Sequence, residues 1–139
     1  MKIRLILSGL CGALLLGSCG GPAGQANEAK ATAATCDLAL EERFTDEQEI
    51  DGQKKRVVSV FVNNYEDACL NKLQAEAQKT QPTPGVATEV YYFDCPGHCP
   101  KLDAKKIDLP ADYQQHCVAR LAIGPDGGAQ FSPRPFAAQ

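Results

Sequence analysis

The chain has 139 residues, with 14 lysines and arginines against 17 aspartates and glutamates, and a formal net charge of −3. This length is typical of one small domain rather than several. Its acidic balance, with Lys54-Lys55-Arg56 as the one basic cluster, excludes a nucleic-acid-binding surface, because neutralising phosphates requires a positive face.

Residues 1–18 have the composition of a secretory signal peptide. Lys2 and Arg4 precede an apolar run from Leu5 to Leu16, which is shorter than the about 20 apolar residues that a membrane-spanning helix needs. An ordinary signal peptide cleaved near Ala23, or a short N-terminal anchor, would also suit this segment. Each of these alternatives places the rest of the chain outside the cytoplasm.

The segment closes on Leu16-Gly17-Ser18-Cys19, which resembles the lipobox of bacterial lipoproteins. The resemblance implies that Cys19 is acylated, with palmitate among its fatty acids, and becomes the mature N-terminus. It also implies a membrane partner through this lipid and, because Gly20 follows the cysteine, the outer membrane facing the periplasm. Several acyl chains anchor a protein stably, whereas one short chain is marginal.

Residues 19–35 are rich in Gly, Ala, Gln and Asn and predict a flexible tether, which leaves residues 36–139 as a single small domain. Of the seven cysteines, Cys11 would be removed with the signal peptide and Cys19 would carry the lipid. Five candidates for disulfide bonds remain, and five is an odd number. Either one thiol is free, or one disulfide forms and three cysteines act together. The five are Cys36, Cys69, Cys95, Cys99 and Cys117.

The first half of the domain predicts one strand and one helix. Residues 36–49 fit either a short helix or an extended arm, and Asp51-Gly52 predicts a turn. Residues 56–62 are almost continuously β-branched or aromatic, which is typical of a central strand buried on both faces. Between residues 65 and 79 the apolar side chains recur every three or four positions and predict an amphipathic helix.

The second half predicts a further strand and a hairpin. Residues 86–94 are apolar on both faces, residues 101–115 allow at most a short helix near their end, and residues 117–123 alternate like a strand before a glycine-rich turn. Strand, helix and strand predict a βαβ unit with a right-handed crossover. The predicted fold class is therefore α+β, or small α/β, with one βαβ unit followed by a C-terminal β-hairpin, stapled by disulfides.

Cys95-Pro96-Gly97-His98-Cys99-Pro100 directly follows the second predicted strand. This Cys-Pro-x-x-Cys-Pro pattern resembles the copper-binding loop of Sco-type thioredoxin-like proteins, which implies a metal held by Cys95 and Cys99. Independently of that family, thiolates and imidazoles are the ligands that Cu(I) and Zn²⁺ favour. Both histidines of the chain, His98 and His116, directly precede a cysteine.

Three interpretations of these residues remain open at this point. If Cys36 pairs with Cys69, then Cys95, Cys99 and Cys117 with His116 would supply three thiolates and one imidazole to a metal. Alternatively, Cys117 forms a structural disulfide with Cys95 or Cys99, or Cys95 and Cys99 act as a redox dithiol.

No hydrolase elbow, phosphate-binding glycine loop or zinc-protease motif occurs, so no catalytic residue is predicted. We expect a membrane-anchored envelope lipoprotein whose small domain is non-enzymatic, requires no cofactor, and has a binding or structural role toward an envelope protein partner. The alternative is a periplasmic thiol-redox, copper-binding or zinc-binding protein acting through Cys95 and Cys99.

Overall fold

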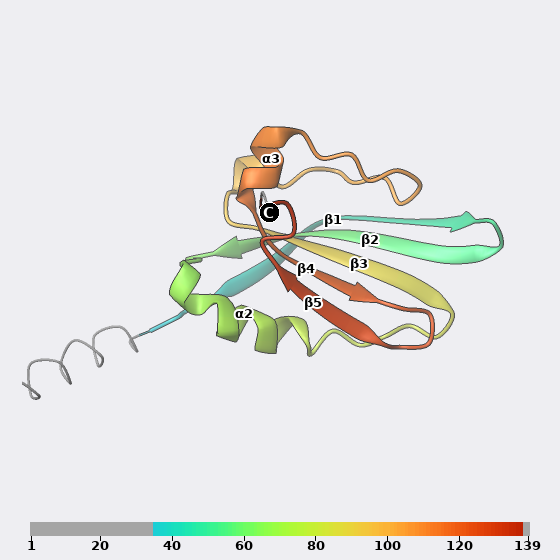
Figure 1. The fold of residues 1–139 in the computed structure, drawn as a ribbon, viewed down its shortest axis with the longest axis horizontal. Coiled ribbons are helices and arrows are strands. Elements are labelled where there is room, and N and C mark those ends of the chain that lie inside the picture. Colours follow the sequence, from blue (N-terminus) through green and yellow to red (C-terminus); the bar gives the residue numbers. More distant parts are fainter. Residues whose placement is uncertain (1–34, 138–139) are drawn as a thin grey trace, which may run out of the picture. The chain divides into compact units, whose positions relative to one another are not determined.

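The structure is a computed structural model that describes residues 35–137. The predicted signal peptide, the predicted lipidation site Cys19 and all but the last residue of the predicted tether lie outside the described residues. The chain from Cys36 onward belongs to one compact unit. This unit is built on a sheet of five strands in the order β1-β2-β3-β4-β5 (Figure 1).

The sheet begins with a long hairpin. β1 (Ala39–Ile50) and β2 (Gln53–Asn63) pair antiparallel across Asp51 and Gly52, whose φ angles are 52° and 79°. Left-handed φ at both central residues defines the type I′ turn that Asp-Gly favours, so the predicted turn is confirmed. β1 carries a bulge at Arg43, where its register against β2 shifts. Bulges and charged side chains are common on edge strands because they discourage pairing with other chains.

The remaining strands follow in chain order. β2 and β3 (Val86–Phe93) pair in parallel, whereas β4 (Cys117–Ile123) is antiparallel to β3, and β5 (Ala129–Pro133) is antiparallel to β4. Between β2 and β3 the chain forms the 3-10 turn η2 (Asp67–Cys69) and the helix α2 (Leu70–Ala77). Between β3 and β4 it forms the 3-10 turn η3 (Pro96–His98) and the helix α3 (Ala111–His116).

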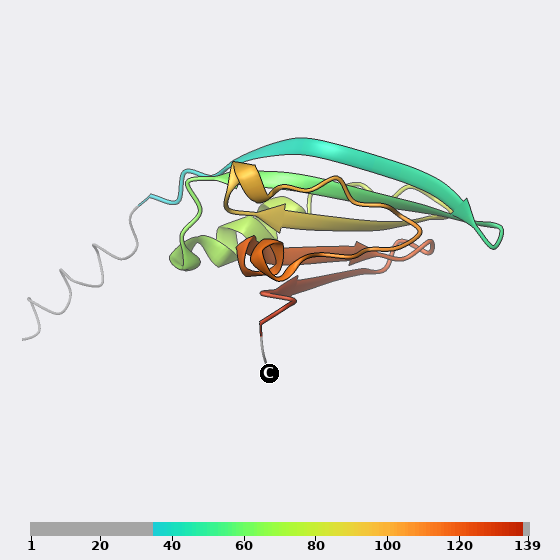
Figure 2. The same cartoon turned by 90° about the horizontal axis from the view of Figure 1, so that it is seen from above.

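Both faces of the sheet are covered, and alternate residues of each central strand serve opposite faces. One face packs against α2 through Leu73, which is fully buried. The other face, which includes Phe93, packs against the segment from residue 94 to residue 116. Figures 1 and 2 show α2 and this segment on opposite sides of the sheet. The two covers explain why β2 and β3 carry apolar side chains on both faces along most of residues 57–62 and 90–93.

The predicted fold class, α+β with one βαβ unit followed by a hairpin, is wrong. Strand makes up 42% and helix only 19% of the structure, and all five strands join one mixed sheet. The main cause is β1, for which a short helix or an arm was expected. Half of its side chains are charged, which suits a strand that lies at the edge of the sheet and is largely exposed. An edge strand can be formed without a continuous apolar run.

A half-buried ionic network joins the three central strands. Glu89 of β3 pairs with Lys55 of β2 at 3.1 Å and with Arg120 of β4 at 2.9 Å, and it accepts a 2.6 Å hydrogen bond from the Tyr91 hydroxyl. Burial alone would raise the pKa of Glu89, but hydrogen bonds from Tyr91 and Lys55 and the charge of Arg120 outweigh it and lower the pKa. Burial and the bond to Glu89 raise the pKa of Tyr91.

Replacing Glu89 by Gln should lower the free energy of unfolding at pH 7 by about 1.5–3 kcal/mol, the usual worth of a hydrogen bond to a charged group. The folded pKa of Glu89 lies below its ordinary value of 4.5, so its ionisation stabilises the fold above that pH, and the effect is lost on acidification below it. Urea unfolding from pH 7 to pH 3 should show the two stabilities converging in acid. The exposed control Glu66→Gln should change stability little, and an equal loss in that variant would contradict the assignment.

Candidate metal centre

The candidate metal centre lies where β3 ends and β4 begins. Asp94 continues β3 by donating its backbone N–H to the carbonyl of His116 at 3.1 Å, so the cysteine loop and the end of α3 lie side by side. The loop is held on the sheet farther along, because the buried Ser59 hydroxyl of β2 donates to the Pro100 carbonyl at 2.6 Å. Residues far apart in the sequence are thereby fixed together at the end of the sheet where β3 ends and β4 begins.

A single 3-10 turn brings Cys95 and His98 together. The His98 backbone N–H donates to the Cys95 carbonyl at 3.0 Å, and Pro96 begins the turn. Side chains three residues apart eclipse each other in such a turn, and here His98 Nδ1 lies 3.3 Å from Cys95 Sγ. The His116 ring stacks on the His98 ring with centroids 4.2 Å apart. Ligand atoms of Cys95, His98 and His116 all lie within 4.8 Å of one another, and all three residues are half-buried.

Neighbouring side chains orient both imidazoles. His116 Nδ1 lies 2.8 Å from Asp94 Oδ1; because the carboxylate can only accept, the ring proton belongs on Nδ1, and Nε2 is then the nitrogen that can offer a lone pair to a metal. The Tyr113 ring lies edge-on to the His98 ring with centroids 5.3 Å apart, and Asp112 Oδ2 lies 3.9 Å from His98 Nε2. Metal-binding histidines usually donate their other ring N–H to a carboxylate in this way. Sequence reasoning missed Asp94, although its place directly after a buried strand and beside the cysteine loop was visible.

Cys99 and Cys117 are free thiols, but the structure does not bring them into this cluster. Both belong to the buried core on the face that the 94–116 segment covers, at 7% and 1% exposure. Burial raises the pKa of Cys99 to about 11 and that of Cys117 to about 12. Such thiols stay protonated near neutral pH, whereas a metal needs the thiolate. The arrangement is thus one cysteine sulfur with two imidazoles, in place of three cysteine sulfurs with His116.

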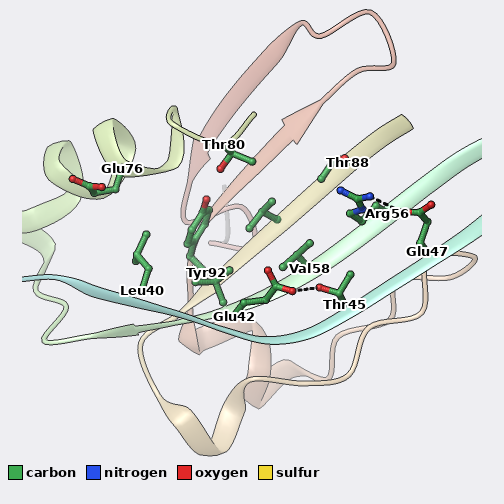
Figure 3. Close-up of a pocket in the computed structure, with 12 residues that line it drawn as sticks. Leu40, Glu42, Thr45, Glu47, Arg56, Val58, Glu76, Thr80, Thr88 and Tyr92 are labelled. Atoms are coloured by element: carbon green, nitrogen blue, oxygen red, sulfur yellow. Dashed lines mark hydrogen bonds and ion pairs between the residues drawn. The ribbon is translucent and has the colours of Figure 1, made fainter. Parts of the chain in front are cut away.

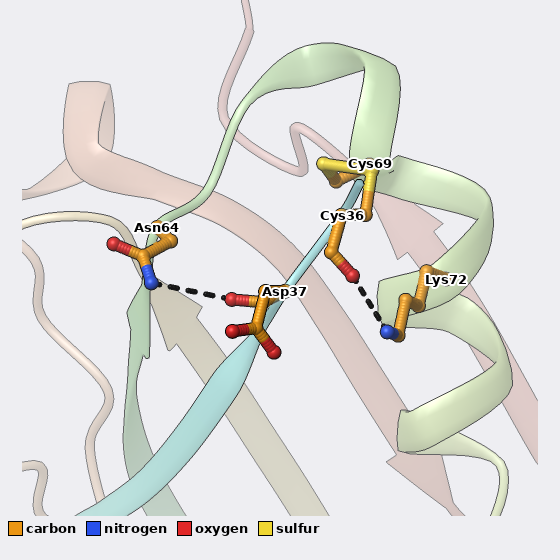
Figure 4. Close-up of a disulfide and its surroundings, with 5 residues drawn as sticks. All are labelled: Cys36, Asp37, Asn64, Cys69 and Lys72. Carbon is orange, nitrogen blue, oxygen red and sulfur yellow. Dashed lines mark hydrogen bonds between the residues drawn. A yellow bond between two sulfur atoms is a disulfide. The ribbon is translucent and has the colours of Figure 1, made fainter. Parts of the chain in front are cut away.

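The first two cysteines of the domain form a disulfide (Figure 4). Cys36 is bonded to Cys69, which lies at the end of η2. The Cys36 carbonyl also accepts a 2.6 Å hydrogen bond from Lys72 of α2. The prediction that the domain contains a disulfide is confirmed, and Cys36 and Cys69 are the pair that forms it. It joins the start of the domain to α2, and Cys95, Cys99 and Cys117 are left unpaired among the cysteines of residues 35–137.

The three ligand atoms suit a small soft or borderline ion. A tetrahedral zinc ion with sulfur and nitrogen ligands at about 2.3 Å and 2.0–2.1 Å would hold those atoms on the order of 3.5 Å apart. Closing the cluster from 4.8 Å therefore asks only for small side-chain rotations. Three protein ligands would leave zinc one open position, whereas Cu(I) is readily satisfied by three.

Within residues 35–137, no helix is long and apolar enough to cross a membrane. No protein family matches the chain, and no curated protein or solved structure is significantly similar to it.

Proposed function

We propose that the protein is a lipid-anchored envelope protein whose domain binds a copper or zinc ion through Cys95, His98 and His116. The observation that carries the metal proposal is the approach of these three ligand atoms to within 4.8 Å of one another. The Asp94 bond behind His116 adds the outer contact that metal-binding imidazoles commonly have. Binding and exchange of an ion would be the activity, and the domain would not need a catalytic residue.

Cu(I) is the ion that the ligand set favours. Thiolate selects soft ions, imidazole suits copper and zinc alike, and three ligands complete the coordination of Cu(I) but not of Zn²⁺. The half-exposure of all three residues would let an ion enter and leave without unfolding the domain. The membrane anchor is supported by the sequence of residues 1–19, because its resemblance to a lipobox implies a lipidated Cys19 and a domain held on the periplasmic side. Such an anchor requires nothing from the folded domain.

Titration of the reduced full-length protein with Cu(I), in competition with a chromophoric chelator, should show one equivalent bound. Cys95→Ser should weaken the affinity at least about 100-fold because it removes the thiolate, and Asp94→Asn should weaken it about 10-fold, in the range usual for outer contacts. A parallel titration with Zn²⁺ should give weaker binding.

Cys99→Ala is the matched control, because it removes the other cysteine of the same loop without touching the cluster. Its affinity should equal that of the unchanged protein. An equal loss in Cys99→Ala and Cys95→Ser would show instead that the two cysteines chelate the ion as a pair. Absence of a bound equivalent in the unchanged protein would end the proposal.

A further inference from the structure

A groove lies on the face of the sheet that α2 covers only in part. α2 packs on this face through its buried Leu73 and also contacts β5, and a hollow remains between Glu76 of α2 and the residues of β1. Figure 3 shows Leu40 and Glu42 along β1 on one side, Glu76 and Thr80 on the other, and Tyr92 between them. The hollow encloses about 520 Å³, within the roughly 300–1,000 Å³ typical of small-molecule sites.

The floor of the groove is apolar. Val58 and Val60 of β2 lie beside Val90 and Tyr92 of β3, and each of these side chains is at most 8% exposed. Burial raises the pKa of Tyr92 to about 12, so its hydroxyl remains a neutral donor. Leu40 at the rim is the large hydrophobic side chain that the described part of the domain exposes most, at 39%. An apolar body that enters would cover Leu40 and the small part of the floor that is still exposed.

The rim carries one carboxylate without a cationic partner. Glu47 is paired with Arg56 at 2.7 Å, and Glu76 is paired with Lys79 at 2.7 Å, so these two carboxylates are neutralised locally. Glu42 accepts a hydrogen bond from the Thr45 hydroxyl, and no ion pair joins it to a cation among residues 35–137. The groove thus presents an apolar floor and a net negative rim, which favours a cation and disfavours an anion.

From this arrangement we infer that the groove binds a small amphiphilic amine, with its apolar part on the valine floor and its ammonium group at Glu42. The site is separate from Cys95, His98 and His116, since it lies on the opposite face of the sheet. Amine binding therefore does not depend on whether the domain binds a metal.

Three phenyl compounds of matched size test the inference: phenethylamine, 2-phenylethanol and 3-phenylpropionate. They are titrated into the full-length protein in zwitterionic nanodiscs, with empty nanodiscs as blank, and the methyl resonances of Val58, Val60 and Val90 are followed by NMR. The amine should shift these resonances saturably and bind about threefold to fivefold tighter than the alcohol, as one partly exposed ion pair allows. The carboxylate should bind weakest.

Two variants and one control distinguish the contribution of the Glu42 charge from that of the space in the groove. Glu42→Gln should reduce amine binding to the level of the alcohol, whereas Glu49→Gln, an exposed carboxylate of the same strand outside the groove, should leave it unchanged. Thr45→Trp should fill the hollow at an exposed strand position and abolish the binding of all three compounds. Equal binding of amine and alcohol, an equal loss in Glu49→Gln, or shifts elsewhere than at the three valines would each overturn the inference.

Discussion

Removing the disulfide by Cys36→Ser with Cys69→Ala should lower the free energy of unfolding by about 3–4 kcal/mol. The bond spans 33 positions of sequence, and in the chain-entropy description a cross-link over such a loop restricts the unfolded state by about that amount. Alanine is chosen at position 69 because this site is only 4% exposed, where a new hydroxyl would add its own cost. The loss is a large fraction of the stability of a small domain, usually about 5–15 kcal/mol in total.

Urea unfolding of the oxidised protein, the reduced protein and the double variant measures this effect. The reduced protein and the variant should unfold at nearly the same urea concentration, well below that of the oxidised protein. Lys72→Met serves as the control, since it removes the hydrogen bond to the Cys36 carbonyl but keeps the disulfide. A reduced protein as stable as the oxidised one would show that the bond contributes nothing.

Replacing Cys19 by Ser should abolish stable membrane attachment of the chain. If the lipobox directs acylation, the variant lacks every acyl chain, and each buried CH₂ of those chains is worth about 0.8 kcal/mol of membrane affinity. The unchanged protein should partition into the detergent phase of a Triton X-114 separation, and the variant should be recovered in the aqueous phase or as an uncleaved precursor. Mass spectrometry of the N-terminal peptide should show the fatty acids on Cys19 alone.

Cys11→Ser is the matched control, because it changes a cysteine of the predicted signal peptide that cleavage would remove. It should be processed and recovered in the detergent phase like the unchanged protein. Normal processing and detergent-phase recovery of Cys19→Ser would contradict the lipoprotein assignment.

The strands that could be predicted are those buried on both faces. Residues 56–62 and 86–94 are recognisable from nearly continuous apolar runs, and the structure has β2 and β3 there. β1 could not be predicted in the same way, since its half-buried side chains include Asp46 and Gln48, which are satisfied by partners distant in sequence. Asp46 accepts the backbone N–H of Ala104, and Gln48 donates to Asp103. In the sequence, polar side chains that form such tertiary hydrogen bonds cannot be told from polar side chains that are exposed to solvent.

For the site, the sequence identified the residue types but not which of them meet. Cys95, His98 and His116 were among the candidates, and their proximity depends on the 3-10 turn and on the backbone bond between Asp94 and His116. Cys99 and Cys117 were equally good candidates by spacing. Only the folded chain shows that both enter the core, where burial keeps them protonated.

The strands lie in the sheet in the same order as in the chain, which affects the order in which they can pair during folding. Each strand pairs with the one synthesised just before it, so no pairing has to wait for a distant segment, which favours fast folding. The β1-β2 hairpin and both partners of the disulfide precede residue 70, so this half can close while the rest of the chain is still emerging. His116 joins Cys95 and His98 only after β4 has docked on β3. A bound ion would therefore mark a chain whose folding is nearly complete.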